Sequence, residues 1–162
     1  MYKKILVPLD GSRLAECALP HAEELAKGCG TEQVVLVSVT ERIQGYGALA
    51  DSNRPTGKRI VPEAVGKKER QAQRYLDRVA RAMEAKGIKV DTEVLLGDPA
   101  EEIIIYSKYP GCDIIVMSSH GRSGIHRWTH GSVADRVFIG SPVPVLMAKA
   151  DACTPGIQAG GR

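Results

Sequence analysis

Five short segments that are mainly apolar or rich in β-branched residues divide the sequence and predict its strands. They are rich in β-branched residues, which is typical of strands that are buried on both faces of a parallel sheet. The runs span Ile5–Val7, Val34–Val39, Val90–Leu96, Ile114–Met117 and Val143–Met147. Pro144 has no N–H to donate to a strand ladder, so the last run is predicted at a sheet edge.

Helical patterns with a period of 3.6 residues lie between these runs. The first spans Leu14 to Lys27, and because Pro20 lacks an N–H, we expect a bend or loosening between Glu16 and Pro20. The clearest pattern spans Lys67 to Lys86, whose charged residues are predicted to form a solvated face. Residues 41–66 contain glycines and prolines without sustained periodicity, which predicts a flexible connection.

Two further helices are predicted after the third and fourth strands. One has its N-cap at Asp98, begins with Pro99 and continues to about Lys108. The other begins after Gly131-Ser132. Its apolar side is predicted to comprise Val133, Ala134, Val137 and Phe138. Five strands joined by four helices predict an α/β fold, with one doubly wound parallel sheet and helices on both faces, as in Rossmann-like proteins.

The polar stretch after the fourth strand is typical of an anion site. Ser118, Ser119, His120 and Gly121 follow the strand, and Gly131-Ser132 precedes the next helix. A helix N-terminus presents unpaired N–H groups and the positive end of the backbone dipole, and glycine lets a phosphate approach closely. A tight turn with Ser132 as an N-cap is the alternative, and the spacing alone does not separate the two.

Length, charge and the size of the apolar runs narrow the range of functions. The 162 residues, 43% hydrophobic and 25% charged, suit one globular domain over residues 1–150, followed by a flexible tail at 151–162. The apolar runs are too short for a membrane span or a signal-peptide core, so we expect a cytoplasmic protein. The net charge is +3, and basic residues between Lys67 and Lys86 alternate with acidic ones, so no nucleic-acid partner is predicted.

Cysteines and histidines give no strong metal or catalytic signal. The four cysteines lack C-x-x-C spacing and are predicted to be reduced thiols. His126 and His130 would share a face of a helix, but the surrounding glycines favour a loop, and no metal site is predicted. The chain has no P-loop, no G-x-Ser-x-G elbow and no evident nucleophile, so it is not predicted to be an enzyme.

The polar stretch resembles the nucleotide-binding motif of the universal stress proteins. Gly121 and Gly131-Ser132 are separated by nine residues, as in that motif, while Ser118 stands in the place of its first glycine. The resemblance covers residues 1–150 and includes segments 3–12, 95–103 and 141–146. It implies the strand order 3-2-1-4-5, a cytosolic role in the stress response, and homodimers paired through Val143–Met147.

The resemblance also implies an ATP site at the carboxyl ends of the first and fourth strands, and leaves open whether Mg²⁺ accompanies the nucleotide. Adenine would contact Pro8, Asp10 and Val39, and the ribose would lie near Met117 and Ser118. The phosphates would be held by Gly121, Gly131, Ser132 and Val133, with charge from Arg122 or Arg127. Outside the resemblance, Asp10 is better interpreted as a turn residue and Val39 as sheet core.

Two functions are compatible with this pattern. The first is a sensing or regulatory protein that binds ATP without fast catalysis, slow hydrolysis being left open. The second is a dimeric interaction module of the same fold that does not bind nucleotide, an alternative that the serine at position 118 keeps open.

The phosphate assignment predicts the effect of one substitution. Gly131→Val should abolish nucleotide binding and leave the fold intact, because a branched side chain would occupy the space of an approaching phosphate. Calorimetric titration with ATP, together with a thermal melt of the variant, measures both effects. Normal melting with wild-type ATP affinity would contradict the assignment.

Overall fold

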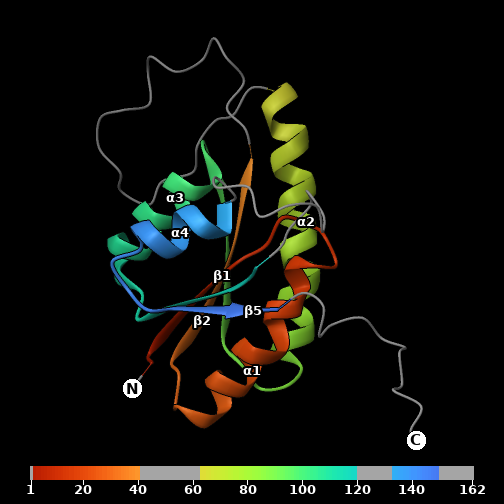
Figure 1. Cartoon of the computed structure of the whole chain (residues 1–162). Coiled ribbons are helices and arrows are strands. Elements are labelled where there is room, and N and C mark those ends of the chain that lie inside the picture. The colour runs from red at the N-terminus through yellow and green to blue at the C-terminus, as the bar shows by residue number, and fades with distance from the viewer. Residues whose placement is uncertain (1, 41–62, 120–132, 150–162) are drawn as a thin grey trace, which may run out of the picture.

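A parallel sheet of five strands forms the centre of the structure (Figure 1). The computed structural model describes residues 2–40, 63–119 and 133–149 of the chain. The strands are β1 (Lys4–Pro8), β2 (Gln33–Thr40), β3 (Val90–Leu96), β4 (Ile114–Ser118) and β5 (Val145–Ala148). They are parallel and lie in the order β3-β2-β1-β4-β5, which confirms the predicted sheet and the strand order that the resemblance implied.

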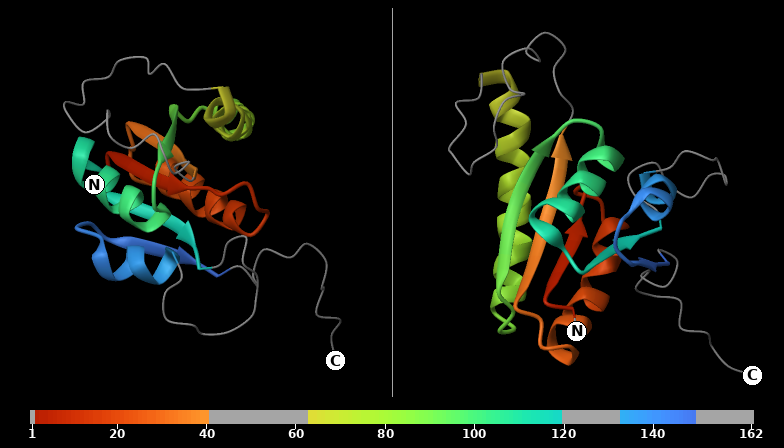
Figure 2. Two further views of the ribbon diagram at one scale, coloured as in Figure 1. Left: turned by 90° about the horizontal axis from the view of Figure 1, so that it is seen from above. Right: turned by 90° about the vertical axis from the view of Figure 1, so that its left-hand side faces the viewer.

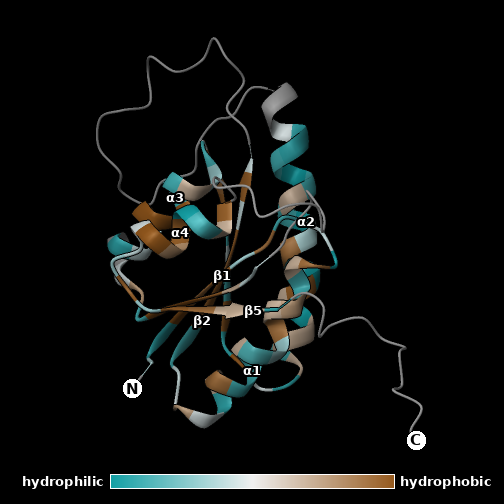
Figure 3. Ribbon diagram, viewed as in Figure 1, coloured by the Kyte–Doolittle hydropathy of each residue, from teal (hydrophilic) through white to brown (hydrophobic). Residues whose placement is uncertain are grey.

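Helices cover both faces of this sheet (Figure 2). They are α1 (Leu19–Gly28), α2 (Glu63–Glu84), α3 (Pro99–Tyr106) and α4 (Val133–Gly140), together with a 3₁₀ turn, η1 (Ala15–Ala18), and a π turn, η2 (Ser107–Gly111). Residues of η1, α1 and α2 pack on one face, and residues of α3 and α4 pack on the other. The apolar strands therefore lie between two helical layers, as the hydropathy colouring shows (Figure 3).

The two layers explain why β1 is apolar at every position from Ile5 to Val7. Ile5 and Val7 enter the core beneath α1 and α2, whereas Leu6 enters the core beneath α3 and α4. All three side chains are fully buried. Successive side chains of a strand point to opposite faces, so a strand covered on both faces needs an unbroken apolar run.

Pro20 divides the first predicted helix, as expected. The segment forms η1 and then α1, and Pro20 lies in the first turn of α1. At that position a backbone N–H has no partner within the helix, so a proline is tolerated there. The prediction of a loosened backbone between Glu16 and Pro20 is confirmed.

Other predicted boundaries were wrong by a few residues. Because α2 begins at Glu63, residues 63–66 of the predicted flexible connection are helical, while residues 41–62 lie outside the described part of the chain. The helix predicted to reach Lys108 ends at Tyr106 and passes into η2. The last strand begins at Val145, and the preceding Pro144 takes part through its carbonyl, which accepts a 2.9 Å hydrogen bond from the Ile115 N–H. The edge position of this strand is confirmed.

The apolar side predicted for α4 was only half right. Ala134 and Val137 are buried, but Val133 is 37% exposed and Phe138 is 60% exposed. Only a narrow stripe of this short helix packs inward, against the core that it shares with α3. Gly140 adds to the close packing, because a Cβ at this position would lie 2.7 Å from Cδ1 of Ile104 on α3.

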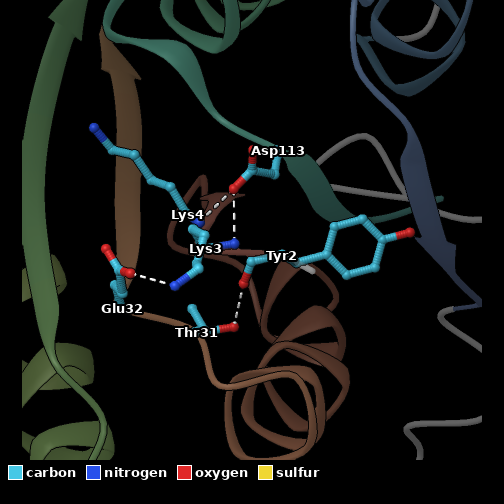
Figure 4. A network of polar contacts seen from close by, with 6 residues as sticks. All are labelled: Tyr2, Lys3, Lys4, Thr31, Glu32 and Asp113. Atoms are coloured by element: carbon cyan, nitrogen blue, oxygen red, sulfur yellow. Dashed lines mark hydrogen bonds and ion pairs between the residues drawn. The ribbon is translucent and has the colours of Figure 1, made fainter.

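A carboxylate joins β1 to β4 at the amino ends of the two strands (Figure 4). Oδ2 of Asp113 accepts hydrogen bonds from the backbone N–H groups of Lys3, at 2.7 Å, and Lys4, at 2.8 Å. The Asp113 N–H in turn donates to the Lys4 carbonyl at 2.9 Å. These three bonds fix the start of β4 beside the start of β1.

Neighbouring contacts secure the same end of β1 (Figure 4). The Thr31 hydroxyl donates to the Tyr2 carbonyl at 2.6 Å, and Lys3 forms an exposed ion pair with Glu32. The hydrogen bond and charge of Glu32 raise the pKa of Lys3, and those of Lys3 lower the pKa of Glu32. The segment before β2 is thereby tied to the first residues of the chain.

Replacing the Asp113 carboxylate should weaken the junction between β1 and β4. Asp113→Ala removes the acceptor of two backbone N–H groups and should lower the free energy of unfolding by about 1 kcal/mol. Asp113→Asn keeps an oxygen acceptor and should cost less. Denaturant unfolding of both variants, with Glu84→Ala as a control for loss of an exposed carboxylate, measures this. An Asp113→Ala variant as stable as the control would contradict the role of the carboxylate.

Candidate functional site

The candidate site lies where β1 and β4 stop pairing with each other and each continues beside its other neighbour in the sheet. The two strands pair only through Ile5↔Ile114 and Leu6↔Ile115. Beyond these pairs, β1 continues along β2 to Pro8↔Val37, and β4 continues along β5 to Ser118↔Ala148. The carboxyl ends of β1 and β4 therefore share no ladder, which is the topological switch point at which ligands bind in open α/β sheets.

The chain leaves β1 through a tight polar turn. Oδ1 of Asp10 accepts the Ser12 N–H at 2.9 Å, and Gly11 has a φ of +83°, a conformation that glycine adopts without strain. Oγ of Ser12 accepts the N–H of Ala15, the first residue of η1, at 3.1 Å. Asp10 is thus a turn residue, as the sequence alone suggested, and its exposed carboxylate lies just beyond the end of β1.

The end of β2 directs backbone groups toward this turn. The Val37 carbonyl accepts the Leu9 N–H at 2.8 Å on the β1 side, while the Thr40 carbonyl accepts the Gly97 N–H at 3.0 Å on the β3 side. Because backbone groups alternate along a strand, those of Val39 point to the β1 side. The Val39 side chain packs against the core under α3 and α4, so the residue combines a core role with backbone groups at the candidate site.

Sequence reasoning missed the hydroxyl of Thr40. Its Oγ1 atom is buried and has no hydrogen-bond partner among the residues that the structure describes. A buried polar atom without a partner is unusual in folded proteins. A hydroxyl residue at the end of a mainly apolar strand was the available signal.

Ser118 is the last residue of β4 and has an extended backbone. An extended conformation is open to any L-residue, so a serine in place of the motif glycine causes no strain. Met117 and Ser118 are each 6% exposed, and Met117 packs into the core under α3 and α4. The following residue, Ser119, is held by a 2.8 Å hydrogen bond from its N–H to the Ala148 carbonyl.

The first residues of α4 are tied to the start of α3. Val133 is the first residue of α4, and Arg136 forms a two-pronged ion pair with Asp98, with N–O distances of 2.9 and 3.0 Å. Asp98 also accepts the Glu101 N–H at 3.0 Å, which confirms the predicted N-cap. Hydrogen bonds from Arg136 and then from Glu101 hold the pKa of Asp98 below its usual value. The pairing of Asp98 with Arg136 was not predicted.

A second unpredicted contact joins η1 to α2. The Tyr75 hydroxyl donates to Oε1 of Glu16 at 3.1 Å, and the Arg78 guanidinium lies 5.4 Å from the centre of the Tyr75 ring. Burial raises the pKa of Tyr75 well above its usual value, and the charges of Glu16 and Asp10 add to the shift. Tyr75 is therefore a neutral donor that holds η1 against α2.

The predicted site residues fall into two groups. The structure places Pro8, Asp10, Val39, Met117 and Ser118 at the ends of β1, β2 and β4, and Val133 at the start of α4. Residues Gly121, Arg122, Arg127, Gly131 and Ser132 lie outside the described residues, as do His120, His126 and His130. The described groups offer backbone and side-chain hydrogen bonds and one carboxylate, a set suited to binding a polar ligand.

Metal, thiol and membrane features can be stated for the described ranges only. Within residues 2–40, 63–119 and 133–149, no cluster of three or more His, Cys, Asp or Glu side chains could hold a metal ion. Cys17, Cys29 and Cys112 form no disulfide, in line with the predicted reduced thiols, and burial raises the pKa of Cys112. No helix in these ranges is both long and apolar enough to cross a membrane.

Similar proteins were found among both sequences and solved structures. Universal stress protein MJ0531 of Methanocaldococcus jannaschii is 34% identical over 149 residues, which cover 92% of this chain and 83% of the relative. Universal stress protein MJ0577 of the same organism is 32% identical, and its solved structure matches with a TM-score of 0.75 over 92% of this chain and 96% of its own.

More distant structures share the fold and carry ligands of their own. A universal stress protein from Archaeoglobus fulgidus was solved in complex with dAMP and is 21% identical, with a TM-score of 0.57. Another universal stress protein was solved in complex with cAMP and is 18% identical, with a TM-score of 0.60. At these identities, the likeness to this chain extends to the fold.

The family model for the Universal stress protein family matches residues 1–149. This match spans all the strands and helices of the structure, including both sides of the switch point between β1 and β4. Together with relatives more than 30% identical over nearly the whole chain, it shows that this chain belongs to the universal stress protein family.

Proposed function

We propose that this protein binds ATP at the carboxyl ends of β1 and β4 and acts as a cytosolic sensor or regulator in the stress response. It releases the nucleotide without fast turnover. Whether Mg²⁺ accompanies the phosphates is left to experiment. In this proposal, the protein works by changing state with nucleotide occupancy.

The separation of β1 from β4 is the observation that carries the proposal. Pairing between the strands ends at Leu6↔Ile115. Each strand then leads to polar residues, Asp10 after β1 and Ser118-Ser119 at the end of β4. A ligand at this point can contact both turns without breaking a ladder. An adenine nucleotide is supported as the class of ligand by the family and by the dAMP and cAMP complexes of its more distant members.

The described geometry suits an adenine base beside the end of β2. The backbone groups of Val39 point to the β1 side, where they can pair with the edge of the base. The carboxylate of Asp10 can accept from an amino group, and Pro8 offers an apolar surface. Met117 and Ser118 would then lie by the ribose, and α4 would begin at the phosphates, beside Val133.

Asp10 provides the test of adenine recognition. Asp10→Ala should weaken ATP binding by roughly tenfold to hundredfold, the usual loss for a hydrogen bond to a charged group. The preference for ATP over GTP should fall as well. Asp10→Asn keeps an oxygen acceptor for the Ser12 N–H, so it tests the loss of the charge without the loss of the turn. Glu24→Ala controls for the loss of an exposed carboxylate. Isothermal titration with ATP and GTP gives both affinities.

Two results would count against the proposal. An unchanged ATP to GTP preference in Asp10→Ala would leave Asp10 as a turn residue only. Wild-type protein that shows no binding of ATP, ADP or AMP, and releases no adenine nucleotide on heat extraction, would favour the interaction module without nucleotide.

A homodimer formed through β5 completes the proposed function. The carbonyls of Pro144 and Ala148 accept hydrogen bonds from β4, so the alternation along the strand turns the backbone groups of Val145 and Met147 away from the sheet. β5 is an edge strand, and its Val145, Leu146 and Met147 side chains are only half-buried. An apolar edge with unpaired backbone groups favours pairing with a second copy across a two-fold axis.

The edge can be blocked with one substitution. Met147→Pro removes an N–H that points away from β4, so it should shift dimer toward monomer while largely preserving the fold. Met147→Ala loses the same side chain but keeps the N–H, and should remain more dimeric than the proline variant. Light scattering at micromolar concentration, with circular dichroism to check folding, measures the outcome. Monomeric wild-type protein would refute the dimer.

A further inference from the structure

Basic residues that are scattered along the sequence of α2 lie together on its solvent-exposed face. Basic and acidic residues alternate between Lys67 and Lys86, so no basic stripe was expected. In the structure, five cations recur at spacings of three or four residues and share the outward face of the helix. They are Lys67, Arg70, Arg74, Arg78 and Arg81, all of them exposed, and are called the cationic stripe below.

The carboxylates of this helix lie off the stripe. Glu69 and Asp77 are half-buried, and Asp77 is engaged by Gln73, which also donates to Thr92 on β3. Among the described residues of α2, the one exposed carboxylate is Glu84, at the last residue. In that part of the chain, no ion pair links Arg74 or Arg81 to a carboxylate.

The stripe is long and narrow. At 1.5 Å per residue, it extends for about 21 Å from Lys67 to Arg81, on a helix about 10–12 Å wide. On the α1 side it is bounded by Glu16, which accepts from Tyr75, and by Glu23, which pairs with Lys86. On the β3 side it is bounded directly by Asp77 and Glu84, which lie about 20° and 40° around the helix from Arg70.

These boundaries select among anionic partners. A nucleic-acid duplex or a membrane spreads its charge over more than the width of one helix, and would bring anions against the flanking carboxylates. A single nucleic-acid strand needs exposed aromatic rings for stacking, but Tyr75 is half-buried and its ring is covered by Arg78. Insertion into a membrane needs apolar anchors, whereas the uncharged exposed residues along the stripe are Gln71, Ala82 and Ala85.

We propose that the cationic stripe of α2 docks an acidic α-helix of a protein partner, with carboxylates repeated every three or four residues along one face. Arginine predominates in the stripe, and its planar guanidinium binds carboxylate through two parallel hydrogen bonds. Two helices laid side by side present charges at the same axial spacing, so Arg70, Arg74 and Arg78 can each meet a carboxylate.

The test uses two synthetic helical peptides of equal composition. In one, all glutamates lie on a single face at spacings of three and four residues, and in the other they are distributed around the helix. Fluorescence anisotropy at low and at physiological ionic strength measures their binding to the full chain. The one-faced peptide should bind several-fold more tightly, and its affinity should fall as salt rises.

Matched charge reversals locate the binding surface. Arg74→Glu with Arg81→Glu reverses two cations of the stripe, and Lys27→Glu with Lys89→Glu reverses two exposed cations elsewhere. Each pair changes the net charge from +3 to −1, since every reversal subtracts two. The stripe variant should lose at least about tenfold in affinity for the one-faced peptide, and the control should lose much less.

Three results would overturn the proposal. Equal binding of the two peptides would show that the spacing of the carboxylates does not matter. Equal losses of affinity in both double variants would show that binding depends only on the overall charge of the protein. Tighter binding of duplex DNA or of phosphatidylserine vesicles, lost in the stripe variant, would assign the surface to a different class of partner. Circular dichroism of both variants ensures that any loss is not unfolding.

Discussion

The junction of β1 with β4 is the constraint on which the site depends. At the amino ends, the Asp113 carboxylate accepts two backbone N–H groups and holds the strands together. Two residue pairs later, each strand turns to a different neighbour. The same pair of strands is thus closed at one end of the sheet and separate at the other. The polar turns at Asp10 and Ser118 lie at the end where the strands are separate.

The sheet was predictable because its chemistry is local. A strand covered on both faces reads as a nearly continuous apolar run, and the segments that form β1 and β4 have this pattern. The start of α3 was equally predictable, since Asp98 and Pro99 lie where an N-cap and a first helical residue are expected. The strand order was predicted from the family resemblance, because the residues of a strand do not indicate which other strands it pairs with.

What escaped prediction depends on which residues meet in space. The pairing of Asp98 with Arg136 joins positions 38 residues apart, and the exposure of Phe138 follows from how narrowly α4 packs. The cations of α2 recur every three or four residues and so share one face of the helix, whereas in the linear sequence they alternate with acidic residues. Val39 illustrates an intermediate case, because its apolar side chain was read as core while its useful groups are in the backbone.

The hydrogen bonds from Lys3 and Lys4 to Asp113 join residues about 110 positions apart. Closing so long a loop costs chain entropy before any contact repays it, so the central pairing of the sheet forms only once most of the chain is available. On the ribosome, β1 and β2 can associate well before β4 has been made. The edge between β1 and β4 therefore does not exist in the nascent chain, and a ligand held there stabilises only the completed fold.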